Sequence, residues 1–369
     1  MKESEPISLN EMGELVQLAT VRKNGFYIRY INNPSERVQL EAVKESGLSI
    51  QFINNPSEEV QLAAVKQDGL SIQFINNPSE QVQLEAIKQN GYAIQYLENP
   101  SERVQLEAVK QSAFYIRYII NNPTEKVQLK VVKQIGGLIR FMDNPSEQVQ
   151  IAAVKQSGNA MKYIVNPSLQ VQLESVRQNG TVIKYIDNPS EEVQIEAVKQ
   201  NGYAIRNINN PSERVQLEAV KQNGYAIRYL ENPSEEVQLI AVKQDGYAIQ
   251  YIDNLSEQVQ LEAVKEDEYA IRYIDNPSEE VQLETIRQDA YNIHYIKNPS
   301  DYIKSIVDVV ETSRRTIYVL HEPNKEPLFS IGCQSNITKE YFIERIYTRD
   351  GGLKDNPHRQ EYLDVIERY

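Results

Sequence analysis

The sequence is built on a 22-residue unit that recurs with almost constant spacing through most of the chain. One clean copy runs from Asn210 to Glu231 and contains the segments Asn-Pro-Ser-Glu, Val-Gln-Leu-Glu-Ala-Val-Lys and Gly-Tyr-Ala-Ile-Arg-Tyr. A unit this short cannot bury its own apolar side chains, so neighbouring units must bury each other's. The period therefore predicts a solenoid of about fourteen stacked repeats.

Each unit carries signals for two helices. Asn-Pro-Ser-Glu predicts the start of the first helix, with Asn as the N-cap, Pro in the first turn and Glu closing a capping box. A Gly farther along, such as Gly224, predicts the end of that helix through a left-handed backbone conformation. Ala113, Glu268 and Ala290 replace this Gly and predict turns that are closed differently. The few residues before the next Asn-Pro allow only a short second helix, partly 3₁₀.

The repeat decays after Pro299. We expect a flexible leader over residues 1–10, the solenoid with a terminal capping repeat over residues 11–312, and a small domain over residues 313–369. In that domain the sequence predicts two strands, at Thr316–Leu320 and Leu328–Cys333, followed by two helices. The expected fold is an all-α solenoid of two-helix repeats with an α+β (ββαα) C-terminal domain.

Composition excludes several classes of protein. The chain has 39 Lys and Arg against 52 Asp and Glu, a balance that opposes general binding to nucleic acid or anionic membranes. A single cysteine, Cys333, excludes an intramolecular disulfide and a cysteine-rich metal site. No apolar run approaches the ~20 residues of a membrane helix, and the N-terminus does not resemble a signal peptide. We expect a soluble cytoplasmic protein without a metal or cofactor.

The segment from Asn55 to Val65, Asn-Pro-Ser-Glu-Glu-Val-Gln-Leu-Ala-Ala-Val, resembles the opening of leucine-rich-variant and HEAT-like helical repeats. It also resembles the short helical repeats of uncharacterised bacteriophage and giant-virus proteins. The resemblance covers about residues 10–300, implies a right-handed α-solenoid and supplies no catalytic residues. This chain has Gln where those families usually have Arg, and its unit is shorter.

A Gln recurs within the apolar arc of every first helix. It could form a row that recognises a ligand, but an unpaired amide at such a place costs about 1–3 kcal/mol. We therefore interpret the column as a structural ladder in which each Gln bonds backbone groups or the adjacent unit. Its members are Gln39, Gln61, Gln83, Gln105, Gln128, Gln150, Gln172, Gln194, Gln216, Gln238, Gln260 and Gln282.

A basic residue also recurs, and an acid commonly stands three residues before it, as in Glu41 and Lys44 or Glu218 and Lys221. The basic column alone could track phosphates. Pairs at this spacing on an exposed helix face contribute only about 0.2–0.5 kcal/mol each, but they cancel the field that a polyanion needs. We interpret this face as solvated and self-neutralised.

Aromatic residues form a third column, on the second helix. Tyr and Arg together are favoured at binding hot spots, whereas the same rings could simply fill the seams between short helices. The candidate partner-binding residues are Tyr203, Arg206, Asn207, Tyr225, Arg228, Tyr229, Tyr247, Tyr251, Tyr269, Arg272 and Tyr273. Asn207 interrupts the column, so a ligand there would meet a gap or a pocket.

Catalysis finds little support in the sequence. The three histidines, His294, His321 and His358, show no metal-ligand spacing, and no phosphate-binding Gly-rich loop or nucleophile elbow is present. Cys333 with His321 or His358 could form a thiol–imidazole pair, although a lone Cys at the end of an apolar strand is usually buried.

The leading hypothesis is a non-enzymatic scaffold that binds another protein through the Tyr/Arg column. The resemblance to viral proteins implies a host protein, for instance a defence factor, as the partner that is blocked. Two alternatives stay open: a solenoid that binds nucleic acid or mimics DNA, and a small enzyme in the C-terminal domain. The sequence does not fix the oligomeric state or the identity of the partner.

Overall fold

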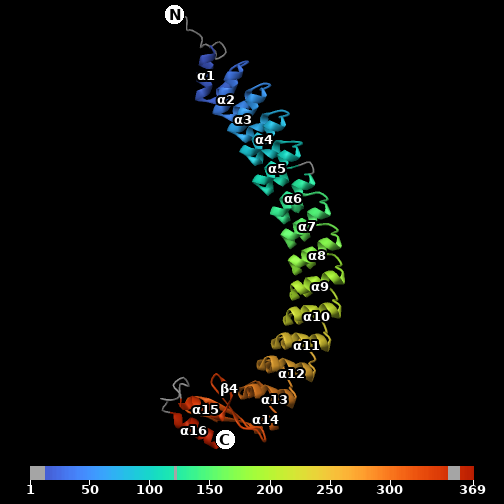
Figure 1. Cartoon of the computed structure of the whole chain (residues 1–369), viewed down its shortest axis with the longest axis vertical. Helices are drawn as coiled ribbons and strands as arrows, with labels where there is room; N and C mark the ends of the chain where they lie inside the picture. The colour runs from blue at the N-terminus through green and yellow to red at the C-terminus, as the bar shows by residue number, and fades with distance from the viewer. Residues whose placement is uncertain (1–12, 120–122, 348–357) are drawn as a thin grey trace. The chain divides into compact units, whose positions relative to one another are not determined.

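A computed structural model describes residues 13–119, 123–347 and 358–369 (Figure 1). The chain divides into two compact units, residues 1–186 and 187–369. Tandem helix pairs of the expected length are present in both, and a sheet with two helices follows them, so the predicted fold class is confirmed. The expected leader, residues 1–10, lies outside the described residues.

Within the described residues of the first unit there are eight α-helices, each followed by a six-residue 3₁₀ helix (η). The pairs are α1 (Glu14–Lys23) with η1 (Gly25–Tyr30), α2 (Glu36–Glu45) with η2 (Gly47–Phe52), α3 (Glu58–Gln67) with η3 (Gly69–Phe74), α4 (Glu80–Gln89) with η4 (Gly91–Tyr96), α5 (Glu102–Gln111) with η5 (Ala113–Tyr118), α6 (Glu125–Gln134) with η6 (Gly136–Phe141), α7 (Glu147–Gln156) with η7 (Gly158–Tyr163), and α8 (Leu169–Gln178) with η8 (Gly180–Tyr185).

The second unit continues the same pattern before it changes to a sheet. Its helix pairs are α9 (Glu191–Gln200) with η9 (Gly202–Asn207), α10 (Glu213–Gln222) with η10 (Gly224–Tyr229), α11 (Glu235–Gln244) with η11 (Gly246–Tyr251), α12 (Glu257–Glu266) with η12 (Glu268–Tyr273), and α13 (Glu279–Gln288) with η13 (Ala290–Tyr295). The short α14 (Asp301–Ile306) follows them. None of the described helices is long and apolar enough to cross a membrane.

Most α-helices of the repeats begin at Ser rather than at Asn, so the predicted cap was wrong. Ser212 is the N-cap of α10, and its Oγ accepts a hydrogen bond from the Val215 backbone N–H at 3.4 Å. Glu213 is therefore the first helical residue and closes no capping box. Asn210 instead has φ 48°, as do its counterparts in most repeats. A residue before Pro avoids the right-handed helical region, and Asn tolerates the left-handed one that the turn needs.

The Gly after each α-helix is needed for space and not for a left-handed conformation, so that expectation was also wrong. Among the described glycines only Gly332 has positive φ. Gly224 begins η10, and a Cβ built on it would lie 2.5 Å from the carbonyl oxygen of Ala241 in the next repeat. The backbones of consecutive repeats approach each other here too closely for a side chain.

Two polar ladders join consecutive repeats. In the first, the last Gln of an α-helix accepts a hydrogen bond from the preceding repeat's Gly, as Gln244 Oε1 does from the Gly224 N–H at 2.7 Å. In the second, the N-cap Ser donates to the Glu that begins the preceding α-helix, as Ser234 Oγ does to Glu213 Oε1 at 2.5 Å. The Gly and Glu that the sequence pattern assigned to the ends of single helices therefore also bond the next repeat and fix the spacing between repeats.

The C-terminal domain contains a four-stranded antiparallel sheet with the order β1-β2-β3-β4. Its strands are β1 (Val307–Glu311), β2 (Thr316–Leu320), β3 (Leu328–Ile331) and β4 (Gln334–Thr338), and the helices α15 (Lys339–Tyr347) and α16 (Arg359–Arg368) follow. The sequence predicted β2 and β3 but missed β1 and β4, so the sheet starts before the expected boundary at residue 313. The apolar period of the residues before β1 suggested that the helix continued, and β4 is too polar to read as a strand.

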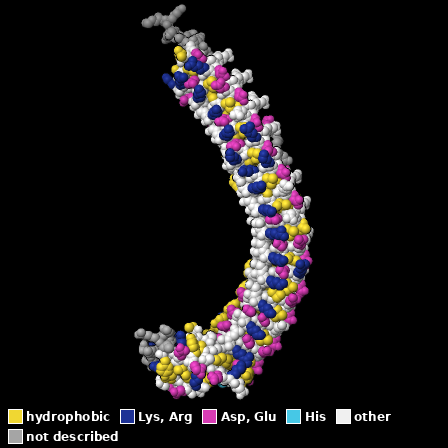
Figure 2. Space-filling model, viewed as in Figure 1, with side chains coloured by type: hydrophobic (Ala, Val, Ile, Leu, Met, Phe, Trp, Pro, Cys, Tyr) yellow, Lys and Arg dark blue, Asp and Glu magenta, His cyan; other side chains and the backbone are white. Residues whose placement is uncertain are grey.

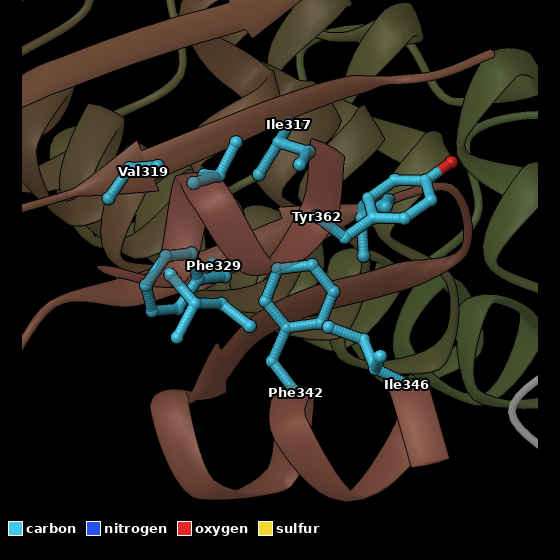
Figure 3. Packing of buried hydrophobic residues seen from close by; sticks show 9 residues of the cluster. Ile317, Val319, Phe329, Phe342, Ile346 and Tyr362 are labelled. Atoms are coloured by element: carbon cyan, nitrogen blue, oxygen red, sulfur yellow. The ribbon is translucent and has the colours of Figure 1, made fainter. Parts of the chain in front are cut away.

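The sheet and the last two helices share a core of their own. Phe329 on β3, Phe342 on α15 and Tyr362 on α16 are all fully buried (Figure 3). The ring centroids of Phe329 and Phe342 lie 5.4 Å apart, and Phe342 and Tyr362 lie 6.5 Å apart. This domain therefore contributes packed apolar surface to the end of the array.

Asn336 attaches the sheet to the last regular repeat. Its Nδ2 donates to the carbonyl oxygens of Ile286 and Arg287, at 3.0 and 2.8 Å, and its Oδ1 accepts from the Ala290 N–H at 3.2 Å. Between regular repeats, backbone groups at these positions bond the Gln at the end of the following α-helix. A single strand residue on β4 thus takes the place of the missing next α-helix.

Candidate functional site

The candidate residues lie on the 3₁₀ helices of the second unit. In η10 the side chains of Ala226 and Ile227 are buried, Tyr225 and Tyr229 are half-buried, and Arg228 is exposed. Asn223 fixes the start of this helix, because its Oδ1 accepts the Tyr225 N–H at 2.9 Å. A 3₁₀ helix has three residues per turn, so it can bury its small and branched residues while the rings and the guanidinium stay at the surface.

Rings of successive repeats meet edge to face and form an aromatic ladder. The first Tyr of one 3₁₀ helix packs against the last Tyr of the next, with interplanar angles between 65° and 89°. The pairs and their centroid distances are Tyr203–Tyr229 at 6.1 Å, Tyr225–Tyr251 at 5.9 Å, Tyr247–Tyr273 at 6.0 Å and Tyr269–Tyr295 at 5.7 Å. Each pair links two repeats, and such contacts contribute about 0.5–1.5 kcal/mol beyond burial.

The rings of the ladder are partly buried between repeats and partly exposed to solvent. Tyr251 and Tyr273 are 41% and 42% exposed, although each is held by a ring of the preceding repeat. The rings therefore fill the seams and also leave part of their surface open to solvent. Both interpretations of the aromatic column describe part of this arrangement.

Two arginines lie over the ladder. The Arg228 guanidinium carbon is 4.5 Å from the Tyr229 ring centroid and 5.5 Å from that of Tyr203, and Arg228 also donates a hydrogen bond to the Tyr229 hydroxyl. Arg272 lies 3.7 Å from the centroid of Tyr295 and 4.9 Å from that of Tyr269. These cation–π contacts orient the guanidinium groups while Arg228 and Arg272 stay exposed.

The environment of the ladder shifts its tyrosine pKa values in both directions. Burial raises the pKa of Tyr225, Tyr247 and Tyr269. The hydrogen bond from Arg228 lowers the pKa of Tyr229. The chemistry that this surface offers is apolar ring area, hydroxyl groups and two oriented cations.

Arg206 and Asn207 lie at the end of η9, beside the first ring pair of the ladder, Tyr203 and Tyr229. Arg206 is exposed and hydrogen-bonds to the Tyr229 hydroxyl, which further lowers the pKa of that group. Asn207 is half-buried, and its Nδ2 finds no acceptor among the described residues. Ten of the predicted binding residues therefore lie in or against the ladder, whereas Asn207 makes no ring contact within the described part of the chain.

The ladder continues past the predicted residues onto the sheet. Tyr291 on η13 meets Tyr318 on β2 edge to face at 5.3 Å. His294 Nε2 lies 2.7 Å from the Tyr318 hydroxyl oxygen. Burial raises the pKa of Tyr318. Sequence reasoning missed Tyr318, because it belongs to a strand and reaches the ladder only through the docking of the sheet on η13.

The part of the first unit that the structure describes has only fragments of such a ladder. Phe26 and Phe52 meet at 6.0 Å, and Tyr92 and Tyr118 meet at 5.1 Å. Other repeats there have Leu48, Leu70, Gly137, Asn159 and Thr181 where the first ring of a pair would stand. An unbroken run of rings over several consecutive repeats is found in the second unit.

The Gln column that was interpreted as structural bonds its own repeat. In each case that the structure shows, the Gln Nε2 donates to the backbone carbonyl five residues earlier, as Gln216 does to Pro211 at 3.0 Å. Distances are 2.8–3.0 Å for Gln39, Gln61, Gln83, Gln105, Gln128, Gln150, Gln172, Gln194, Gln216, Gln238 and Gln282, and 3.3 Å for Gln260. Gln282 also joins the next segment, because its Oε1 accepts the Ser300 N–H at 2.9 Å. The Gln residues at the ends of the α-helices likewise join repeats, and sequence reasoning did not single them out.

An acidic side chain lies beside each imidazole of the C-terminal domain. Cys333 is exposed in the turn after β3, contrary to the expected burial. His321 Nε2 lies 3.2 Å from Asp308 Oδ2. Ser313 Oγ and Glu361 Oε1 both approach the same His358 nitrogen, Nδ1, at 2.6 and 2.8 Å. The described residues contain no cluster of His, Cys, Asp and Glu that could hold a metal ion.

Comparison with known proteins gives one match. Residues 57–100 and 234–278 are similar to a family described as "Domain of unknown function (DUF4116)". The first of these segments covers the length of two 22-residue units, so the family's domain corresponds to a pair of these repeats. Neither a curated protein nor a solved structure matches the chain.

Proposed function

We propose that this chain is a non-enzymatic scaffold that binds another protein through the aromatic ladder of its second unit. The observation that carries the proposal is the series of edge-to-face Tyr pairs from Tyr203 to Tyr295, with Arg228 and Arg272 oriented over them. Rings that are already held by their neighbours lose little conformational entropy when a partner covers them. Tyr and Arg are also the residue types most enriched at binding hot spots.

The proposed interface uses the exposed part of each Tyr pair in the ladder. Ring edges and faces at Tyr251 and Tyr273 offer apolar contact area, while Arg228 and Arg272 offer directional hydrogen bonds to carboxylate or carbonyl groups. One Tyr pair follows another at each repeat, so an extended segment or a flat surface of a partner could contact several pairs in succession. The resemblance to viral repeat proteins makes a host lysate the first source of partners to test.

Affinity capture with matched variants tests this proposal. The ladder variant combines Tyr225→Ala, Arg228→Ala and Tyr229→Ala, and we expect it to weaken partner binding by at least about 30-fold, because hot-spot residues each cost 2 kcal/mol or more. The control variant changes Arg214, Glu218 and Lys221 to Ala on the exposed face of α10 in the same repeat. We expect it to bind normally.

Site-specific photo-cross-linking gives an independent result. A photoreactive phenylalanine analogue at position 251 should cross-link to the captured protein, and the same analogue at position 214 should not. Circular dichroism establishes that the ladder variant is folded. Equal capture by the two triple variants, or cross-linking from position 214 alone, would contradict the proposal. Loss of capture on adding duplex DNA would favour DNA mimicry as the mode of binding.

A further inference from the structure

Charge is locally cancelled on the exposed face of the α-helices. Glu41 lies 3.5 Å from Lys44 in its own helix and 2.8 Å from Arg22 in the preceding repeat. Lys243 likewise lies 3.8 Å from Glu262 of the next repeat. A basic residue in this column therefore has an acid at this position on its own helix, on the following helix, or on both.

Helix α6 breaks this pattern. Lys130 stands at the position of the acid, and the same position in α7 is Ala152. Lys133 thus has no acid on its own helix at this spacing and none on the next. Among the described residues neither Lys130 nor Lys133 forms an ion pair, and α6 carries three Lys against one Glu.

The unpaired charges border two adjoining hollows with an apolar floor. One has a volume of about 430 Å³ and the other about 460 Å³, and both are lined by Leu106, Lys126 and Lys130. Glu102 and Glu107 also line the first and Glu125 lines the second, but basic residues outnumber acids in both. Leu129 and Lys133 line the second. Dark blue side chains gather over α5 and α6 in Figure 2. Lys126 is held by Glu102 at 3.0 Å but is still 70% exposed. We call this surface the cationic groove.

We propose that the cationic groove binds an acidic peptide segment that carries one apolar anchor side chain. Carboxylates of the segment would neutralise Lys130 and Lys133, and the anchor would cover Leu106 and Leu129. Half-buried leucines beside unneutralised lysines fit a ligand with both properties, since charge sets the specificity and apolar burial adds affinity.

Nucleic acid fits this groove less well. A phosphate backbone needs a continuous basic track, but the neighbouring helices α4 and α7 have at least as many acids as bases. A phosphodiester would also leave the leucine floor uncovered. The groove lies on α5 and α6 of the first unit, so it stands independently of the aromatic ladder and of the function proposed for it.

Fluorescence anisotropy with a defined probe tests the inference on the full-length protein. The probe is a short labelled peptide in which one Leu is flanked by Asp and Glu, and a second probe has Ser in place of Leu. We expect the Leu probe to bind more tightly than the Ser probe. Lys130→Glu, which restores the acid of the other repeats, should weaken its binding about tenfold, and Lys133→Glu should act similarly.

The control is Lys66→Glu on α3, which makes the same charge change on an exposed Lys and should leave binding unchanged. Four results would overturn the inference: no binding of the Leu probe at physiological salt, equal binding to the Lys130→Glu protein, displacement of the probe by a DNA oligonucleotide at lower concentration than by unlabelled peptide, or self-association that Lys130→Glu abolishes. The Tyr225→Ala, Arg228→Ala and Tyr229→Ala variant should bind the probe normally, which separates this site from the ladder.

Discussion

Two adjacent glycines in η6 allow a sharp test of how the repeats are stacked. A Cβ at Gly136 would lie 2.3 Å from the carbonyl oxygen of Ala153 and 3.0 Å from Gln156 Oε1. A Cβ at Gly137 would meet nothing nearer than a ring carbon of Tyr163 at 4.0 Å. Neither glycine has positive φ, so space alone distinguishes them.

The expected effects have opposite signs. Gly137→Ala should stabilise the protein by about 0.4–1 kcal/mol, because Ala restricts the unfolded chain and fits the native backbone. Gly136→Ala has the same entropic gain, but it must push α7 away from η6. Overpacking of this kind costs about 1–3 kcal/mol, so we expect a net destabilisation of about 1–2 kcal/mol.

Urea unfolding followed by far-UV circular dichroism measures both changes. Hydrogen exchange adds the location, since the loss of protection in Gly136→Ala should be greatest in α6 and α7. Equal stability of the two variants would refute the reasoning, as would a Gly136→Ala protein more stable than the original. Either outcome would mean that close backbone approach does not select Gly at this position.

Two further predictions concern the C-terminal domain. Asn336→Ala should destabilise the attachment of the sheet by about 1–3 kcal/mol, because it leaves the Ala290 N–H and two α13 carbonyls unpaired. Faster hydrogen exchange at the end of α13 would show this effect. The control is Asn324→Ala, in an exposed turn. Arg287 lowers the pKa of Glu322 from 4.5 to about 2, so the pair should stabilise the fold fully above about pH 4.5 and lose this effect as the pH falls toward 2. Arg287 is 41% exposed, which limits the effect to about 1–2 kcal/mol. Thermal melts of Glu322→Gln should therefore differ from the original protein near neutral pH and converge in acid, and a constant difference would contradict the assignment.

The sequence predicted what depends on residues close together in the chain. The period and the two helices per repeat follow from local patterning, and both are present in the structure. The same patterning placed β2 and β3, which are short and mostly apolar runs. Local reasoning failed at the turns, where Asn, Ser and Gly are each compatible with more than one role.

Only the tertiary structure decided those roles, because they depend on a neighbouring repeat. Gly136 looks like a helix terminator until the Ala153 carbonyl is seen to occupy the place of its side chain. Asn336 and Tyr318 belong to a sheet whose sequence contains no repeat, yet the sheet extends the hydrogen bonds and rings of the array. The sequence of each unit determines its local conformation. The contacts between units, which decide why a particular residue is needed at positions such as Gly136, are formed only when the repeats stack.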